Sequence, residues 1–258
     1  MVFGVIAIAL IWTSSAFADQ LTITKTANLI EPSYPDVSLD ILGVKPGMSL
    51  DAARKALIAN YHVQPASQSA SMSLTYRTVN MSSQTYVTSL TVHDKQGGSM
   101  KVHFGTPATG NTVVQVDRVI MFPDVKKAPT VAAVRAALDK KYGPESWSDS
   151  HGAYLFWAFD KSGHASPCAK NHSCGAGDGC GSASAAIYKR ELASGDYVYI
   201  QVDVGSSGED PSRMYSLTIY LNNEADKAIS CNAASRQINA AAVAAYKKES
   251  TPGAAPKL

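Results

Sequence analysis

The chain has 258 residues, of which 45% are hydrophobic, and its 23 basic residues nearly balance its 21 acidic residues. The formal net charge is +2, and no run of Lys or Arg is longer than two residues. Because binding to nucleic acid or to a membrane surface needs a clustered basic face, we expect neither as a partner. The length is sufficient for a proper hydrophobic core in one large domain or two small ones.

The first 18 residues are typical of a signal peptide. An uncharged apolar run covers residues 2–12, whereas a bilayer-spanning helix needs about 20 residues. Ala16 and Ala18 place small side chains where signal peptidase requires them. We therefore predict cleavage after Ala18 and a periplasmic or secreted protein with no stable membrane insertion after cleavage. An uncleaved anchor or a buried N-terminal helix is the alternative, and the lack of Lys or Arg before the run leaves the true start codon open.

Residues 19–40 form a polar, extended lead-in, and a first helix-plus-sheet unit is expected over residues 41–123. Ser49 can cap a helix whose apolar residues recur on one face, namely Leu50, Ala53, Leu57 and Tyr61. Stretches rich in Val, Thr and Tyr then predict strands at residues 73–80, 86–93, 99–105 and 112–122.

A second unit with the same order of elements is expected over residues 124–222. Thr130 can cap a helix that stops at Gly143-Pro144, and its apolar stripe contains Val131, Val134, Leu138 and Tyr142. Strand-like stretches follow at residues 153–160, 185–191, 196–205 and 213–221. We therefore predict an α+β fold of two tandem units, each a helix packed on an antiparallel sheet that can run continuously through both. Coincidental similarity of two amphipathic helices is the alternative.

Two further segments lie outside this pattern. Residues 161–184 form an insertion rich in Gly, Ser and Ala, which cannot bury a core of its own. Residues 223–258 predict a C-terminal helix with the narrow apolar stripe Ile238, Ala242, Ala245 and Tyr246, followed by a mobile tail.

The four cysteines favour disulfide bonds. Cys168, Cys174 and Cys180 lie in the insertion, and Cys231 lies far downstream. In an oxidising compartment we expect one disulfide from Cys231 to the insertion and a second that closes a small ring within it, from Cys168 to Cys180 or Cys174. A metal site is the alternative, although the short C-x₂₋₄-C pairs of structural zinc sites are missing; its further ligands would be His164, His172 and Asp178.

One predicted hairpin brings two histidines together. Its apolar residues all have even numbers, so cross-strand partner numbers must add to an even total. This favours a three-residue loop, Gly97-Gly98-Ser99, which places His93 opposite His103 on the solvent face. The pair could hold copper or zinc, but no third ligand is evident, so two exposed histidines are the simpler interpretation and no cofactor is expected.

The sequence contains no motif that indicates catalysis. A nucleophile elbow G-x-S-x-G, the zinc motif H-E-x-x-H and a phosphate-binding loop that opens a helix are all missing. We therefore expect no enzymatic activity, and a hydrolase with an unrecognised site remains open.

Aromatic residues mark a candidate binding face on the last two predicted strands. If their alternating aliphatic residues point inward, the outer face carries Tyr197, Tyr199, Met214 and Tyr220. Tyrosine and methionine are favoured at protein-binding surfaces because they offer much contact area at modest entropic cost. Simple cross-strand pairing is the alternative interpretation.

Two short segments resemble a known superfamily. These are LGVKPGMSL at residues 42–50, which leads into the first helix, and KYGPES at residues 141–146. They are similar to the repeat of the secreted β-lactamase inhibitory protein and of the small outer-membrane assembly lipoproteins. The resemblance implies helical elements packed on an antiparallel sheet. The lipoproteins' cysteine and a counterpart of the insertion are missing, and no inhibitor contact residue matches, so inhibition is not implied.

These patterns predict an exported, disulfide-stapled protein of the cell envelope. We expect it to bind an envelope or secreted protein, of unassigned identity, through the outer sheet face. A periplasmic metal-binding protein is the first alternative, and a hydrolase is the second.

Overall fold

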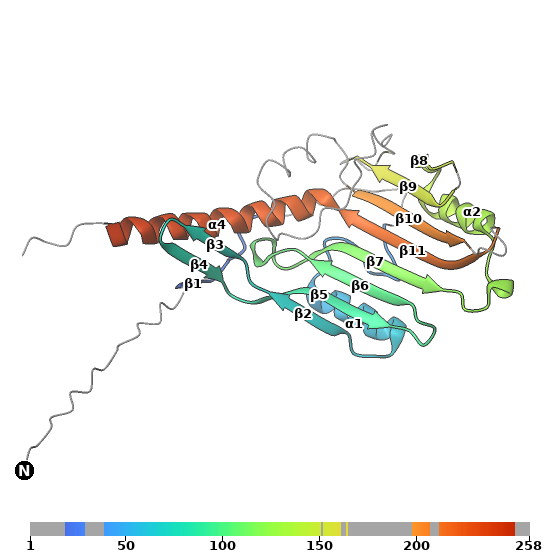
Figure 1. Ribbon diagram of the computed structural model, residues 1–258, viewed down its shortest axis with the longest axis horizontal. Helices are drawn as coiled ribbons and strands as arrows, with labels where there is room; N and C mark the ends of the chain where they lie inside the picture. The colour runs from blue at the N-terminus through green and yellow to red at the C-terminus, as the bar shows by residue number, and fades with distance from the viewer. Residues whose placement is uncertain are drawn as a thin grey trace, which may run out of the picture.

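The computed structural model describes residues 19–28, 39–150, 152–160, 164, 198–206 and 212–250. The fold class is α+β, as predicted: among the described residues there are an eight-stranded sheet, a smaller three-stranded sheet, three α-helices and two short 3-10 helices, η1 (Pro107–Thr109) and η2 (Val125–Lys127). Figure 1 shows the small sheet and most of the C-terminal helix to one side of the large sheet.

The large sheet has the strand order β2-β5-β6-β7-β11-β10-β9-β8, and all its pairs are antiparallel. In the first half, helix α1 (Leu50–Tyr61) precedes β2 (Ala66–Ala70), β5 (Tyr86–His93), β6 (Ser99–Phe104) and β7 (Val113–Met121). In the second half, helix α2 (Val131–Tyr142) precedes β8 (Trp147–Ser148), β9 (Tyr154–Phe159), β10 (Val198–Ser206) and β11 (Met214–Asn223). The last strands of the two halves, β7 and β11, pair and make the sheet continuous.

Both helices begin at the predicted caps. The hydroxyl of Ser49 accepts a hydrogen bond from the backbone N–H of Ala52, and that of Thr130 accepts one from Ala133. Each cap satisfies an N–H group that the first helical turn leaves unpaired. Ser49 also forms a bridge with Thr112 and Thr130 forms one with Arg213, so each cap residue lies beside the residue that precedes the last strand of its half.

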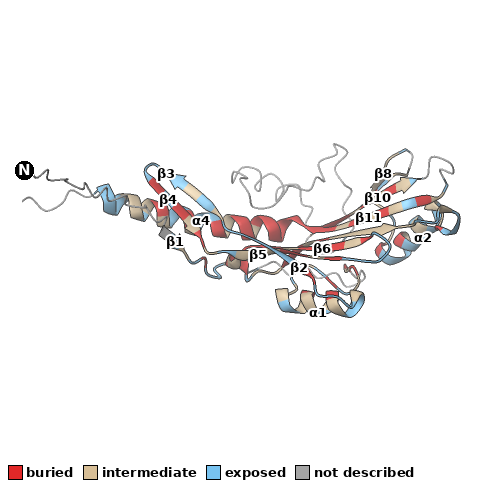
Figure 2. Ribbon diagram, turned by 60° about the horizontal axis from the view of Figure 1, so that its bottom comes forward, coloured by how far each residue is buried: buried red, intermediate tan, exposed pale blue. Residues whose placement is uncertain are grey.

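The main core lies between the helices and one face of the large sheet, which we call the inner face. Leu57 of α1 and Leu138 of α2 join one cluster with buried strand residues, among them Leu90, Val102, Trp157, Ile200 and Leu221. Figure 2 shows the sheet nearly edge-on, with α1 on one side of it. The opposite face, which we call the outer face, carries the alternate residues of each strand.

The small sheet is built from the tip of a long hairpin. Strands β2 and β5 pair in the large sheet, and the same hairpin continues as β3 (Ser73–Tyr76) and β4 (Val79–Ser83), which pair with each other. The lead-in adds β1 (Asp19–Leu21), parallel to β4. The predicted single strand at residues 73–80 is therefore wrong, because Arg77, with φ 54°, turns the chain back.

Helix α4 (Glu224–Ser250) continues directly from β11 and runs to the small sheet. Its residues Ala234, Ile238 and Ala242 form a second core with Val79 and Met81. Between the two sheets, α4 is fixed at the short turn η1 (Pro107–Thr109). There the buried hydroxyls of Thr106, Thr109 and Ser230 are hydrogen-bonded to one another.

The predicted loop of the β5–β6 hairpin is also corrected. Val92 pairs with Met100 and His93 with Ser99, so the partner numbers have an even total, as predicted, but residues 94–98 form the loop. The carboxylate of Asp94 stabilises this longer loop by accepting hydrogen bonds from the N–H groups of Gln96 and Gly98. Side-chain-to-backbone bonds of this kind are what make Asp favourable in turns.

Candidate functional site

The outer face of the large sheet brings polar and aromatic side chains together in three rows. The rows follow from the strand register, because directly paired residues point to the same face. Each row crosses the sheet from β6 to β9, and each of its residues pairs with the next. The row nearest α4 contains His103, Gln115, Asn222, Tyr199 and Ala158. The middle row contains Lys101, Asp117, Tyr220, Gln201 and Phe156, and the far row contains Ser99, Val119, Thr218, Asp203 and Tyr154.

The structure places only part of the predicted binding face at the surface. Tyr220 lies half-buried on the outer face, in the middle row. Tyr199 is on the same face but only 3% exposed, because the first turn of α4 lies beside it and its hydroxyl donates a hydrogen bond to Glu224 (3.4 Å). Met214 is fully buried, which contradicts the prediction, and Tyr197 lies outside the described residues.

A β-bulge explains the position of Met214. The register between β10 and β11 shifts after Gly205, which pairs with Ser216, whereas Ser206 pairs with Met214. The extra residue in β11 is Tyr215, and it reverses the alternation of the strand beyond it, so that Met214 joins the main core. A Cβ atom at Gly205 would collide with the hydroxyl of Ser216 and would lie 2.8 Å from the ring of Tyr215, so the bulge needs glycine here.

Aromatic residues outside the predicted set complete the surface. Tyr154 and Tyr215 are each 47% exposed, and the rings of Trp147 and Phe156 pack with centroids 5.4 Å apart. The alternation of Tyr154 and Phe156 with the buried Leu155 and Trp157 could have indicated this face from the sequence.

Asp203 is a half-buried acid on this surface. Burial raises the pKa of its carboxyl group, and the hydrogen bond from Gln201 (2.8 Å) only partly opposes that shift. Within the part of the chain that the structure describes, no Lys, Arg or His is paired with this carboxylate. Burial also raises the pKa of the Tyr220 hydroxyl, and the negative charges of Asp203 and Asp117 raise it further.

The two histidines of the predicted pair lie apart. His93 pairs with Ser99 and His103 pairs with Ser89, so the longer loop moves them out of register and they are not opposite. His103 instead contacts the carboxylate of Asp117 (2.8 Å), which also accepts a hydrogen bond from Gln115. Across the described residues, no three His, Cys, Asp or Glu side chains form a group that could hold a metal ion.

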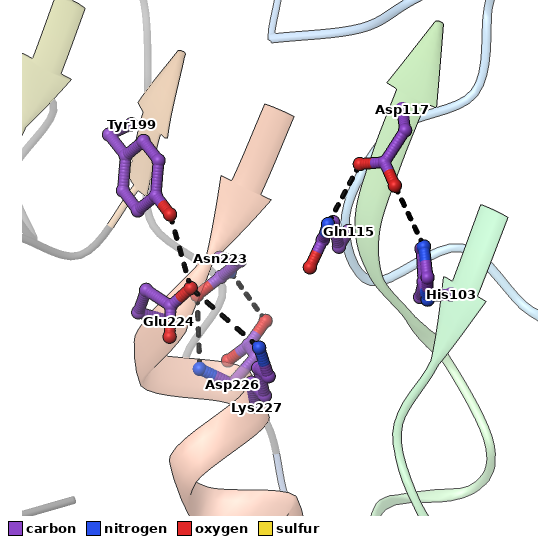
Figure 3. A network of polar contacts seen from close by, with 8 residues as sticks. All are labelled: His103, Gln115, Asp117, Tyr199, Asn223, Glu224, Asp226 and Lys227. Atoms are coloured by element: carbon purple, nitrogen blue, oxygen red, sulfur yellow. Dashed lines mark hydrogen bonds and ion pairs between the residues drawn. The ribbon is translucent and has the colours of Figure 1, made fainter. Parts of the chain in front are cut away.

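A second polar group lies at the start of α4, beside the first row (Figure 3). Asn223 caps the helix by accepting a hydrogen bond from the N–H of Asp226. Glu224 lies 3.9 Å from the ammonium group of Lys227, and all three charged residues are less than 9% exposed. Charges are rarely buried without partners, so this group fixes the first turn of α4 against the sheet.

The predicted disulfides involve residues that are mostly outside the described part of the chain. Cys168, Cys174 and Cys180 lie there, as do His172 and Asp178, so their pairing stays a prediction. Cys231 is buried on α4, 2% exposed, and is not a free thiol. His164 lies near Asp160 and is largely exposed.

Comparison with known protein families, with curated proteins and with solved structures finds no match. Among the described helices, none has the length and apolar character needed to cross a membrane. The function is therefore inferred from the surface of the molecule.

Proposed function

We propose that the chain is an exported binding protein of the cell envelope, and that it recognises a partner protein through the outer face at β9, β10 and β11. Export is supported by the signal-peptide pattern of residues 1–18 and by the clustered cysteines. The likeness to the β-lactamase inhibitory protein and the assembly lipoproteins stays a prediction.

The observation that carries this proposal is Asp203. A carboxylate that is partly removed from water, with a raised pKa and no Lys, Arg or His paired with it among the described residues, costs stability in the free protein. Its neighbours on the face are the rings of Tyr154 and Tyr220. An acid between aromatic rings is well suited to a Lys or Arg side chain, which gains both an ion pair and a cation–π contact.

The partner is therefore expected to present a basic side chain to this part of the face. Tyrosine and tryptophan are enriched among residues that dominate binding energies, which favours Tyr154, Tyr215 and Trp147 as further contacts. Bringing a cation to Asp203 would lower the pKa of its carboxyl group, so capture should weaken as the pH falls and the carboxyl becomes protonated.

Capture of partners from an envelope extract by immobilised protein tests the proposal. Asp203→Asn should reduce capture about tenfold or more, as expected for loss of a charge pair at an interface. Asp124→Asn is the matched control, because it removes the same charge from an exposed acid in another part of the fold, where Asp124 pairs with Lys127. Equal capture by both variants would contradict the proposal.

A further inference from the structure

Strand β2 (Ala66–Ala70) is an exposed edge of the large sheet. It is the first strand in the sheet order, and among the described strands it pairs with β5 alone, at the border of the sheet in Figure 1. All five of its residues are exposed. The N–H and C=O groups that an edge strand directs away from its neighbour can pair with a strand of another chain. In the part of the chain that the structure describes, no backbone hydrogen bond is made on this side of β2.

This edge lacks the features that usually oppose such pairing. Natural edge strands are commonly protected by charged side chains, by proline or by an inserted residue. No residue from Val63 to Tyr76 has a formal charge, and Pro65 lies directly before β2 but not within it. The register shift between β2 and β5 leaves Thr88 of β5 as the extra residue, so β2 itself has none inserted. All five residues of β2 are therefore able to pair with a further strand.

The opposite edge of the sheet differs from β2 in length and in charge. Strand β8 has only two residues, Trp147 and Ser148, and the acidic residues Glu145 and Asp149 lie close to it in the sequence. A very short edge strand with charged neighbours is protected against pairing with another chain. The fold thus protects one edge of the large sheet and leaves the other accessible.

The sequence of β2 is suited to pairing with a second copy of itself. Residues 66–70 read ASQSA in both directions. Paired residues of an antiparallel ladder share a face, and the one symmetric register that pairs all five residues has Gln68 at its centre. This register places Ser67 opposite Ser69 of the second copy, and Ala66 opposite Ala70. Small side chains then lie opposite small side chains, and no like charges meet.

We infer that the protein forms a symmetric dimer in which β2 pairs antiparallel with β2 of a second copy, with Gln68 at the two-fold axis. An antiparallel pair within one sheet has its two-fold axis perpendicular to that sheet, so the outer faces of both copies lie on the same side. Strands β5, β6 and β7 separate β2 from β11, so the region proposed for partner binding stays accessible in both copies. The dimer goes beyond the proposed function and does not depend on it.

Sedimentation of the protein purified after export tests the dimer. Because a ladder of five residues is a small interface, the average mass should rise from that of a monomer towards that of a dimer between about 10 µM and 1 mM. Hydrogen exchange over the same range locates the contact, since backbone amides of β2 should become protected as the concentration rises. Association without protection of β2 would overturn the inference. A monomer at every concentration would also overturn it, and would leave this edge to a strand of another protein.

Charge substitutions at Gln68 test the register. Gln68→Lys or Gln68→Glu places two like charges opposite each other at the axis, so each variant alone should associate at least about tenfold more weakly than the natural sequence. An equimolar mixture of the two variants should recover the association, because Lys then lies opposite Glu. Unchanged association of the single variants, or a loss that the mixture does not recover, would contradict the dimer.

The matched controls are Gln96→Lys and Gln96→Glu. Gln96 is exposed in the β5–β6 loop, on the far side of β5 from the edge, so neither substitution should change the association. Gln68 accepts a hydrogen bond from Ser89 (3.0 Å), so melting temperatures verify that its variants fold, and the measurements on the natural sequence need no variant. Asp203→Asn should leave the dimer intact, which distinguishes a failure of this inference from a failure of the proposed function.

Discussion

The two faces of the large sheet use the same eight strands for different purposes. The inner face is a continuous aliphatic and aromatic core closed by α1 and α2, and its residues are almost completely buried. The outer face carries amides, acids and tyrosines, from the fully buried Asn222 and Tyr199 beside α4 to Tyr154, which is 47% exposed. The inner face therefore provides stability, whereas the outer face contains polar and charged groups and is the face that we propose for partner binding.

The largest expected contrast comes from truncating an aromatic residue on each face. Trp157 on the inner face is 1% exposed, and its indole N–H donates a hydrogen bond to the carbonyl of Gly143 (2.7 Å). Trp157→Ala should cost about 3–5 kcal/mol of unfolding free energy, because it leaves a large cavity and an unpaired carbonyl. Tyr154→Ala on the outer face should cost less than about 1 kcal/mol. Chemical denaturation measures both, and similar losses would refute the division between the faces.

An intermediate loss of stability is expected at the β-bulge, which changes the face to which the residues of β11 point. Gly205→Ala would place a methyl group too close to Ser216 and Tyr215, so β10 or β11 must move. We expect a loss of about 1–3 kcal/mol, typical of overpacking, measured by thermal or chemical unfolding. Ser206→Ala, at the exposed neighbour, is the control and should have little effect. A harmless Gly205→Ala would mean that the bulge does not need glycine.

The smallest expected effect is that of Asp203→Asn, which should raise the unfolding free energy instead of lowering it. Because burial raises the pKa of Asp203 in the folded state, the folded chain binds a proton more readily than the unfolded chain. The contribution of this residue to stability is therefore most favourable below the ordinary Asp pKa, and declines as the pH rises through the raised pKa. Asp203→Asn should remove that decline and raise the unfolding free energy at neutral pH by less than about 1 kcal/mol, since solvent screens a half-buried group.

This prediction concerns the free protein and needs no partner. Melting temperatures of the natural sequence and of Asp203→Asn are compared across acidic and neutral pH. A variant that is less stable than the natural sequence at neutral pH would show that the carboxylate has a stabilising partner.

Much of the inner face could be predicted from the sequence. The caps Ser49 and Thr130 act locally, through hydrogen bonds to residues three positions away, so the helix starts were predictable. The alternation of aliphatic residues in β10 predicted which face of the strand is buried, because every second residue of a strand points to the core and must be apolar there.

The outer face was less predictable because its geometry depends on contacts distant in sequence. Met214 is buried through a bulge that Gly205 permits from the neighbouring strand, and Tyr199 is buried beside the start of α4. The loop of the β5–β6 hairpin depends on the side chain of Asp94, which a count of alternating residues does not include. The burial of Asn222 gave no signal in the sequence, because it depends on which residues lie beside it in the folded chain.

The contact between α4 and the lead-in has a consequence for the order of folding. Gln237 exchanges hydrogen bonds with the backbone of Thr24, across 213 positions of the chain. Contacts of such high sequence separation form late, because the chain loses the entropy of closing a long loop before the contact contributes any stabilising energy. Val79 and Met81 at the hairpin tip therefore stay exposed until α4 has formed and packs on them. Exposed apolar residues of an incompletely folded chain favour aggregation, so we expect this stage of folding to be sensitive to it.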